Sequence, residues 1–144
     1  MTHPRRIFLF GLGYSALHFA RGARDMAEWI GGTTRSVEKA TALAAEGLRP
    51  FLYDGVAAGV GVGEAARVAT HVVSSIAPGD HDPVLACHAE SIMAARDLRW
   101  IGYLSTVGVY GNYGGAWVSE ATTPHAVQER AVKRLAAERA WKKL

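Results

Sequence analysis

Short runs of apolar and β-branched residues alternate along this chain with longer, alanine-rich segments of helical period. A strand that is followed by a helix and then by another strand is the repeating unit of a parallel sheet. The pattern therefore predicts an α/β protein with a doubly wound parallel sheet, five recognisable strands and helices on both faces. The predicted strands lie at residues 7–10, 29–34, 49–53, 69–76 and 99–105.

Capping residues mark where several of the predicted helices begin and end. Ser36 is a good N-cap for a helix at residues 37–46, and Gly47 follows that helix where a left-handed residue is favoured. Asp82 and Pro83 supply an N-cap and a first-turn proline for another helix. The residues expected to form buried stripes are Leu85, Ala89, Ile92 and Met93 in that helix, and Val127, Ala131 and Leu135 in a last helix that starts near residue 123.

The composition limits the kind of protein. With 144 residues, of which 49% are hydrophobic and 20% are charged, the chain is long enough for one globular domain and too apolar for a disordered segment. The formal net charge of +3 does not by itself indicate nucleic-acid binding, and aromatic residues are not interleaved with basic ones. We therefore expect one domain, residues 1–144, and no nucleic-acid partner.

Cysteine usage and hydropathy bear on metals and location. Cys87 is the single cysteine, and no two histidines have the spacing of a helical metal site, so we expect no metal and a reducing, cytoplasmic setting. The longest uncharged stretch, residues 100–119, contains too many glycine and polar residues to cross a membrane. As an alternative, Arg5 and Arg6 followed by the uncharged residues 7–20 resemble the start of a secretory or twin-arginine signal peptide, although glycines and a histidine interrupt the apolar region.

The first predicted strand ends in Gly11-Leu-Gly13-Tyr-Ser-Ala16, which matches the pattern G-x-G-x-x-G/A at a strand-to-helix junction. Gly11 would permit the tight turn, Gly13 would let a pyrophosphate approach the backbone, and Ala16 would let the helix pack on the sheet. Free N–H groups at the helix start, around Tyr14 and Ser15, would hold the phosphates. The motif predicts a Rossmann-type dinucleotide-binding domain; the alternative is a glycine-rich turn without a ligand.

The end of the second predicted strand bears on which dinucleotide would bind. Thr34, Arg35 and Ser36 stand there, with no Asp or Glu. An acidic side chain at this point would bond the ribose hydroxyls of NAD, whereas an arginine and hydroxyl groups accommodate a 2′-phosphate. The sequence therefore favours NADP(H) over NAD. In the alternative interpretation Arg35 is a solvated surface residue and Ser36 is only a helix cap.

Two segments after the fifth predicted strand complete a family pattern. They are Leu104-Ser-Thr-Val-Gly-Val-Tyr-Gly111 and Gly114-Gly-Ala-Trp-Val-Ser-Glu120. Together with the glycine turn they resemble the extended short-chain dehydrogenases/reductases, and more closely the atypical branch of NAD(P)-dependent epimerase/dehydratase-like proteins. The resemblance covers nearly the whole chain and implies a nicotinamide dinucleotide cofactor on a doubly wound sheet.

The resemblance also implies roles for individual residues. In the family, the segment after the fifth strand carries the Ser or Thr that bonds the substrate carbonyl next to the cofactor, a role that falls on Thr106, with Ser105 beside it. Asp54, just after the third predicted strand, matches a position that often contacts the adenine. The segment that lies under the cofactor corresponds to Ser75, Ile76 and Ala77.

The sequence departs from the family pattern at the general acid/base. The superfamily uses a Tyr followed four residues later by a Lys, and no Tyr of this chain has a Lys at that spacing. When the last helix is aligned with the family, Arg130 and Arg134 stand at these two positions. Arginine stays protonated and cannot act as a base at neutral pH. Arg134 would bind a phosphate or ribose, or both arginines would be exposed on a solvated helix face.

A second departure from the family is length. Extended members carry further strands and a C-terminal substrate-binding portion that this sequence lacks, so we expect either a truncated product or a site completed by another chain. An exposed apolar edge of the sheet would favour a homodimer.

These observations lead to one functional hypothesis and two alternatives. The leading hypothesis is an NAD(P)-dependent oxidoreductase or epimerase/dehydratase-like protein that binds NADP(H) and acts on a small carbonyl or sugar-type substrate. The first alternative is a non-catalytic NADP(H)-binding sensor or interaction module, which the missing Tyr and Lys would allow. The second is an inactive fragment of a longer enzyme.

Overall fold

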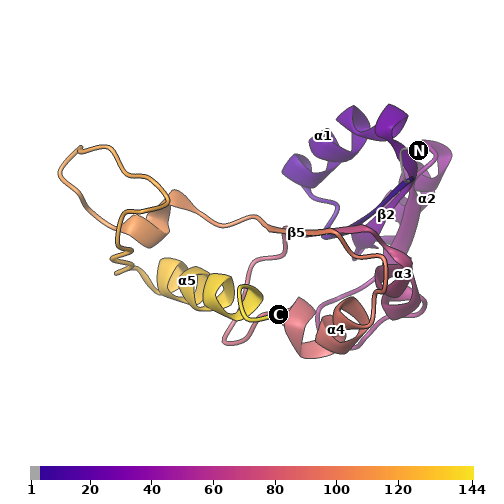
Figure 1. Ribbon diagram of the computed structural model, residues 1–144. Helices are drawn as coiled ribbons and strands as arrows, with labels where there is room; N and C mark the ends of the chain where they lie inside the picture. Colours follow the sequence, from indigo (N-terminus) through magenta and orange to yellow (C-terminus); the bar gives the residue numbers. More distant parts are fainter. Residues whose placement is uncertain (1–3) are drawn as a thin grey trace.

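The computed structural model describes residues 4–144. All strand pairs in this part of the chain are parallel, and the strand order is β3-β2-β1-β4-β5. This order confirms the doubly wound, Rossmann-type α/β fold. Figure 1 shows the course of the chain through the sheet and its helices. The elements are β1 (Arg5–Phe10), α1 (Tyr14–Gly22), the 3-10 turn η1 (Arg24–Met26), β2 (Ala27–Thr34), α2 (Val37–Ala45), β3 (Arg49–Leu52), α3 (Val62–Val68), β4 (His71–Ser74), α4 (Pro83–Met93), β5 (Trp100–Tyr103), the 3-10 turn η2 (Val107–Tyr110) and α5 (Glu129–Trp141).

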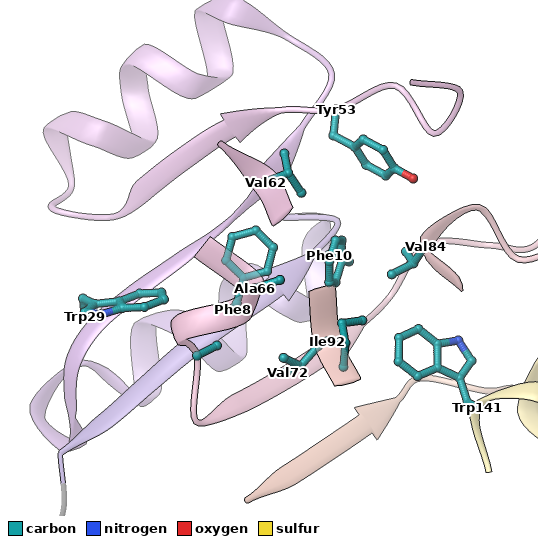
Figure 2. Close-up of a cluster of buried hydrophobic side chains, with 11 residues drawn as sticks. Phe8, Phe10, Trp29, Tyr53, Val62, Ala66, Val72, Val84, Ile92 and Trp141 are labelled. Carbon is teal, nitrogen blue, oxygen red and sulfur yellow. The ribbon is translucent and has the colours of Figure 1, made fainter. Parts of the chain in front are cut away.

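The central strand β1 is buried on both faces, which is why it reads as a continuous apolar run. Successive side chains of a strand point to opposite faces. Ile7 and Leu9 pack with buried residues of α1 and α2, whereas Phe8 and Phe10 pack with residues of α3, α4 and α5. Figure 2 shows the second of these clusters, with Trp141 of α5 at its margin. Two separate hydrophobic layers therefore hold helices on the two faces of the sheet.

The capping signals read from the sequence are confirmed. The Ser36 hydroxyl accepts a hydrogen bond from the Lys39 backbone N–H at 3.1 Å, and the Asp82 carboxylate accepts one from the Leu85 N–H at 2.9 Å. Gly47 follows α2 with a φ of +83°. These caps fix where the second and fourth helices begin, next to the carboxyl ends of β2 and β4.

The last helix begins later than the sequence pattern predicts. α5 starts at Glu129 rather than near residue 123, and Val127, expected in its buried stripe, is 83% exposed. Most residues from 112 to 130 are exposed, so a helix there would bury no apolar face, and burial supplies most helical stability in proteins. The first buried residue of α5 is Ala131.

The buried face of α4 also differs from the prediction. It consists of Val84, His88 and Ile92, whereas Met93 is 61% exposed. Ile92 is buried as predicted, and Leu85 is partly buried against the same core. Val84 and His88 are buried in place of Leu85 and Ala89, which lie one residue, about 100°, further around the helix. Spacing alone does not decide which of two neighbouring stripes of side chains faces the sheet. The buried stripe contains His88, and a histidine is not expected in a hydrophobic core from the sequence.

No helix among the described residues is long and apolar enough to cross a membrane.

Candidate functional site

A cleft of about 690 Å³ opens at the carboxyl ends of β1, β2, β3 and β4. It includes the point where the strand order reverses between β1 and β4, and ligands of open parallel sheets bind at such a point. The cleft is lined by residues 11–13, 33–36, 53–55 and 75–77, together with Lys39 and Pro83. The predicted residues Gly11, Gly13, Thr34, Arg35, Ser36, Asp54, Ser75, Ile76 and Ala77 thus lie along one cleft.

Gly11 is required by the protein itself. Its φ of +88° disfavours any other residue, and a Cβ atom there would lie 2.9 Å from both Ser75 Oγ and Ile76 Cγ1. Its N–H donates to Thr33 Oγ1 at 2.7 Å, and the Ser75 hydroxyl donates to its carbonyl at 2.6 Å. Side chains from β2 and from the segment after β4 therefore hold the turn after β1 in place.

Gly13 has no such internal reason to be glycine. Its φ of −80° suits any residue, and a Cβ atom built there meets nothing within 4 Å. Gly13 lines the cleft at the N-terminus of α1. A ligand that approaches the backbone at this point would explain the glycine, because a side chain would keep it away.

The start of α1 differs from the starts of α2 and α4. No side chain caps its first turn, whereas Ser36 and Asp82 cap the other two helices. Its first turn, like that of α4, holds no acidic residue. Its first N–H groups lack intrahelical partners, which favours an anion there. Tyr14 and Ser15 are exposed, with side chains outside the cleft lining, so their contribution would come from the backbone; Ala16 is buried against the sheet.

Two cations lie near the end of β2. Arg35 lines the cleft, is exposed and has no ion-pair partner within residues 4–144. The Lys39 ammonium of α2 donates to the Leu12 carbonyl at 2.6 Å, across the glycine turn. Lys39 was missed by the sequence reasoning, although its place one helical turn after the N-cap Ser36 would put it on the same side of the helix. Both cations would attract an anion into this part of the cleft.

The residues after β3 form another wall. Tyr53 is buried and its hydroxyl donates to the Pro83 carbonyl at 2.8 Å. Burial raises the pKa of Tyr53 far above its ordinary value, so this tyrosine is neutral and serves as a wall. Asp54 accepts hydrogen bonds from the N–H groups of Val56 and Ala57 at 2.8 and 3.2 Å, and these bonds lower the pKa of its carboxyl.

Ser105 and Thr106 lie apart from the cleft. Both are exposed, and neither is among the residues that line it. The Thr106 hydroxyl accepts a hydrogen bond from the Gly108 N–H at 3.3 Å and caps the turn η2. Figure 1 shows the segment between β5 and α5 (orange to yellow) reaching away from the sheet. The structure does not bring the residues expected to orient a substrate carbonyl to the predicted cofactor residues.

The two arginines of α5 also lie outside the cleft. Arg130 is exposed, and the Arg134 guanidinium donates to the Leu104 carbonyl at 2.8 Å. The Arg134 guanidinium also lies over the Tyr103 ring, 5.7 Å from its centroid. In this arrangement Arg134 fastens the C-terminal helix to the end of β5. Within residues 4–144 no group of three or more His, Cys, Asp or Glu side chains could hold a metal ion.

Comparison with known proteins gives structural matches. No protein-family model and no curated protein matches this sequence. A conserved protein of unknown function from Silicibacter pomeroyi is 36% identical, with a TM-score of 0.79 over 94% of this chain and 47% of its own. A protein from Methylobacillus flagellatus assigned as an NAD-dependent epimerase/dehydratase is 20% identical, with a TM-score of 0.77 over 96% of this chain and 50% of its own.

A nucleoside-diphosphate-sugar epimerase from Pseudomonas aeruginosa is 16% identical, with a TM-score of 0.73 over 99% of this chain and 48% of its own. This chain thus spans about half the length of the solved structures it matches. The resemblance read from the sequence is confirmed at the level of structure: the chain has the Rossmann-type fold of NAD-dependent epimerase/dehydratase-like proteins.

Proposed function

We propose that this chain is an NADP(H)-binding domain and that the cleft at the carboxyl ends of β1 and β2 holds the phosphate-bearing half of the cofactor. The observation that carries the proposal is the pairing of an uncapped helix N-terminus at Gly13 with two cations, Arg35 and Lys39, in one cleft. A Cβ atom at Gly13 would occupy free space at the point where a pyrophosphate would lie, so the cleft fits this group.

The absence of an acidic side chain at the end of β2 supports NADP(H) over NAD. The residues that line the cleft there are Thr33 to Ser36, and Arg35 is free to pair with a phosphate. An arginine forms strong, bidentate hydrogen bonds with phosphate groups. Asp54 lines the cleft after β3, and we assign it the adenine contact that the family resemblance implies.

The proposed activity is that of an NAD(P)-dependent oxidoreductase or epimerase/dehydratase-like protein with a small carbonyl or sugar-type substrate. A bound nicotinamide would supply hydride transfer. This chain's contribution is to bind and orient the dinucleotide, with Thr106 as the residue proposed to orient the carbonyl. Two structural matches, an NAD-dependent epimerase/dehydratase and a nucleoside-diphosphate-sugar epimerase, support this kind of chemistry.

A second candidate function is a non-catalytic NADP(H)-binding module. The exposed Thr106 and the engagement of Arg134 with the Leu104 carbonyl favour it, because neither group faces the cleft. The two candidates differ in turnover: hydride exchange with a carbonyl compound would support the enzyme, and tight binding without exchange would support the module.

The test of the proposal is a parallel titration of the purified chain with NADPH and NADH, followed by tryptophan fluorescence and thermal unfolding. A ligand at a hundredfold excess over its Kd stabilises the fold by about 2.7 kcal/mol, which a melting curve detects easily. We expect saturable binding of both dinucleotides with the lower Kd for NADPH. A folded chain that binds neither at millimolar concentration would contradict the proposal.

A further inference from the structure

Ser36 lines the cleft together with the two cations Arg35 and Lys39, and its hydroxyl takes part in two hydrogen bonds. Its oxygen accepts from the Lys39 backbone N–H at 3.1 Å, and it donates its proton to Glu38 Oε2 at 2.7 Å. A hydroxyl group has one proton to donate. While the bond to Glu38 persists, Ser36 cannot donate to a phosphate in the cleft.

Glu38 carries a full negative charge at neutral pH. The hydrogen bond from Ser36 lowers the pKa of its carboxyl, and a position in the first turn of α2 favours the charged form further. The side chain is exposed and lies outside the cleft lining, so the carboxylate reaches the cleft only through Ser36. Taken alone, Glu38 would be an ordinary first-turn acidic residue that stabilises its helix.

A 2′-phosphate and a 2′-hydroxyl would interact differently with the hydrogen-bonded pair Ser36 and Glu38. A phosphate bonded to Arg35 and Ser36 would have to replace the carboxylate as the acceptor of the Ser36 proton and would lie close to a second negative charge. A ribose hydroxyl is neutral and can donate to a carboxylate or accept from Ser36. The pair therefore opposes the preference that Arg35 and Lys39 create.

We propose that Glu38 is a specificity-determining residue that narrows the difference in affinity between NADPH and NADH by holding the Ser36 hydroxyl. The inference rests on the proposed function, since it concerns the same cleft. Glu38 acts through Ser36 and is a positioning residue. The unmodified chain accordingly binds NADH with an affinity closer to that for NADPH than the two cations alone would give.

The test compares Glu38→Gln and Glu38→Ala with Glu28→Gln in calorimetric titrations with NADPH and NADH. Glu28 is also exposed and lies near the start of β2, at the opposite end of that strand from the cleft, so its variant makes the same change in net charge. We expect Glu38→Ala, which removes both the charge and the acceptor of the Ser36 proton, to bind NADPH roughly three- to tenfold more tightly. Glu38→Gln removes the charge but keeps an acceptor oxygen, so its gain should be smaller. NADH affinity should stay within about twofold, and Glu28→Gln should change neither Kd.

The possible results distinguish a failure of the role proposed for Glu38 from a failure of the proposed function. A gain for NADPH that shrinks as salt is raised would support the role of Glu38, because a loss of helix stability alone would weaken both dinucleotides together. An unchanged ratio of the two Kd values in both Glu38 variants, with NADPH still bound by the unmodified chain, would overturn the inference and leave the proposed function standing. A folded, unmodified chain that binds neither dinucleotide would overturn both.

Discussion

The turn after β1 and the segment after β5 leave the same edge of one parallel sheet, yet they are held in different ways. Gly11 forms hydrogen bonds with Thr33 of β2 and with Ser75, which directly follows β4. The hydroxyl of Thr106 bonds only two residues further along, to the Gly108 N–H. Hydrogen bonds between residues far apart in the sequence therefore hold the glycine turn of the proposed cofactor site. The residues expected to bind a substrate lie in a segment whose hydrogen bonds are mainly local.

Other contacts of the segment after β5 repeat this pattern. The Tyr113 hydroxyl donates to the Thr123 carbonyl at 2.5 Å, and Asn112 caps the Gly114 N–H at 2.8 Å. Trp117 is fully exposed. The stronger ties to the rest of the molecule come from α5, where the buried Trp141 indole donates to Asp82 at 3.0 Å. The segment is therefore anchored at its two ends.

The largest effect should come from Gly13→Val. A side chain there would fill the space for the pyrophosphate without disturbing the fold, since a Cβ atom meets nothing within 4 Å. We expect NADPH affinity to fall by roughly 100-fold, about 2.7 kcal/mol, with the melting temperature almost unchanged. Calorimetry and thermal unfolding measure the two quantities. Gly11→Ala is the matched opposite and should lower stability first, and retention of NADPH binding by Gly13→Val would show that the ligand lies elsewhere.

Trp141→Phe tests whether α5 serves the stability of the fold and not the cleft. The variant leaves a buried Asp82 oxygen without its donor, which should cost about 1–3 kcal/mol of unfolding free energy. NADPH affinity should stay within about twofold, because neither residue lines the cleft. Urea unfolding gives the free energies, and Trp117→Phe, at a fully exposed position, is the control expected to change little. A large loss of affinity in Trp141→Phe would mean that the two regions are coupled.

Arg35→Glu tests the ribose end of the cleft. Reversal of this charge should lower NADPH affinity by roughly tenfold or more and reduce the difference from NADH, because a carboxylate repels a 2′-phosphate and accepts from a 2′-hydroxyl. Arg5→Glu, an exposed arginine at the start of β1, makes the same change in net charge far from the cleft. If Arg35→Glu left the NADPH/NADH ratio unchanged, the assignment of the 2′-phosphate site would be wrong.

The cleft residue Tyr53 packs against the hydrophobic core, and the pH dependence of the unfolding free energy tests this packing. His88 is buried against Phe10 and Tyr53, with ring centroids 5.3 and 5.1 Å away, and burial lowers its pKa below the ordinary 6.5. The unfolded chain therefore takes up a proton that the folded chain resists, so stability should fall as pH drops below about 6.5. One proton gives a slope of at most about 1.4 kcal/mol per pH unit.

Urea unfolding between pH 7.5 and 5.5 measures this slope, and His88→Leu should flatten it. Part of the slope should persist, since burial also lowers the pKa of His71, with a smaller contribution from Arg5 and Arg99. The negative charge of Glu64 acts in the opposite direction and raises the pKa of His88. Equal slopes in the two proteins would mean that His88 is protonated freely in the folded state.

The smallest effect should come from Thr106→Ala. Thr106 is exposed, caps a short 3-10 turn and lies outside the cleft, so NADPH affinity and stability should each change by less than about 0.5 kcal/mol. Calorimetry and urea unfolding provide both values. A clear loss of NADPH affinity would mean that the segment after β5 closes over the cleft when the cofactor binds, which would remove the contrast between the two regions.

The features of the cleft that follow from local rules could be predicted from the sequence. Gly11 and Gly13 mark a strand-to-helix turn, and Ser36 and Asp82 are caps whose hydrogen bonds lie within four residues. The apolar run at residues 7–10 could be read as a strand, and it shows no alternation because β1 is buried on both faces. These signals are short-range, and the structure bears them out.

The features that depend on packing between elements could not be read in the same way. Lys39 reaches Leu12 only because α2 lies beside the turn after β1, a contact across 27 positions. His88 lies in the core where Ala89 was expected, because a four-residue period does not specify which of two neighbouring residues faces the sheet. The start of α5 was predicted too early, near residue 123, because the sequence does not show that most residues up to 130 are exposed and bury no apolar face.

The most direct test of the account is a calorimetric titration with 2′-phospho-ADP-ribose, the part of NADP that lacks the nicotinamide. If the cleft binds the adenosine and phosphates through the glycine turn, Arg35 and Lys39, the Kd of this fragment should lie within about threefold of that of NADPH. Nicotinamide mononucleotide should then bind far more weakly. Binding of NADPH without measurable binding of 2′-phospho-ADP-ribose would contradict this claim. The affinity would then come from contacts with the nicotinamide half and not from the glycine turn, Arg35 and Lys39.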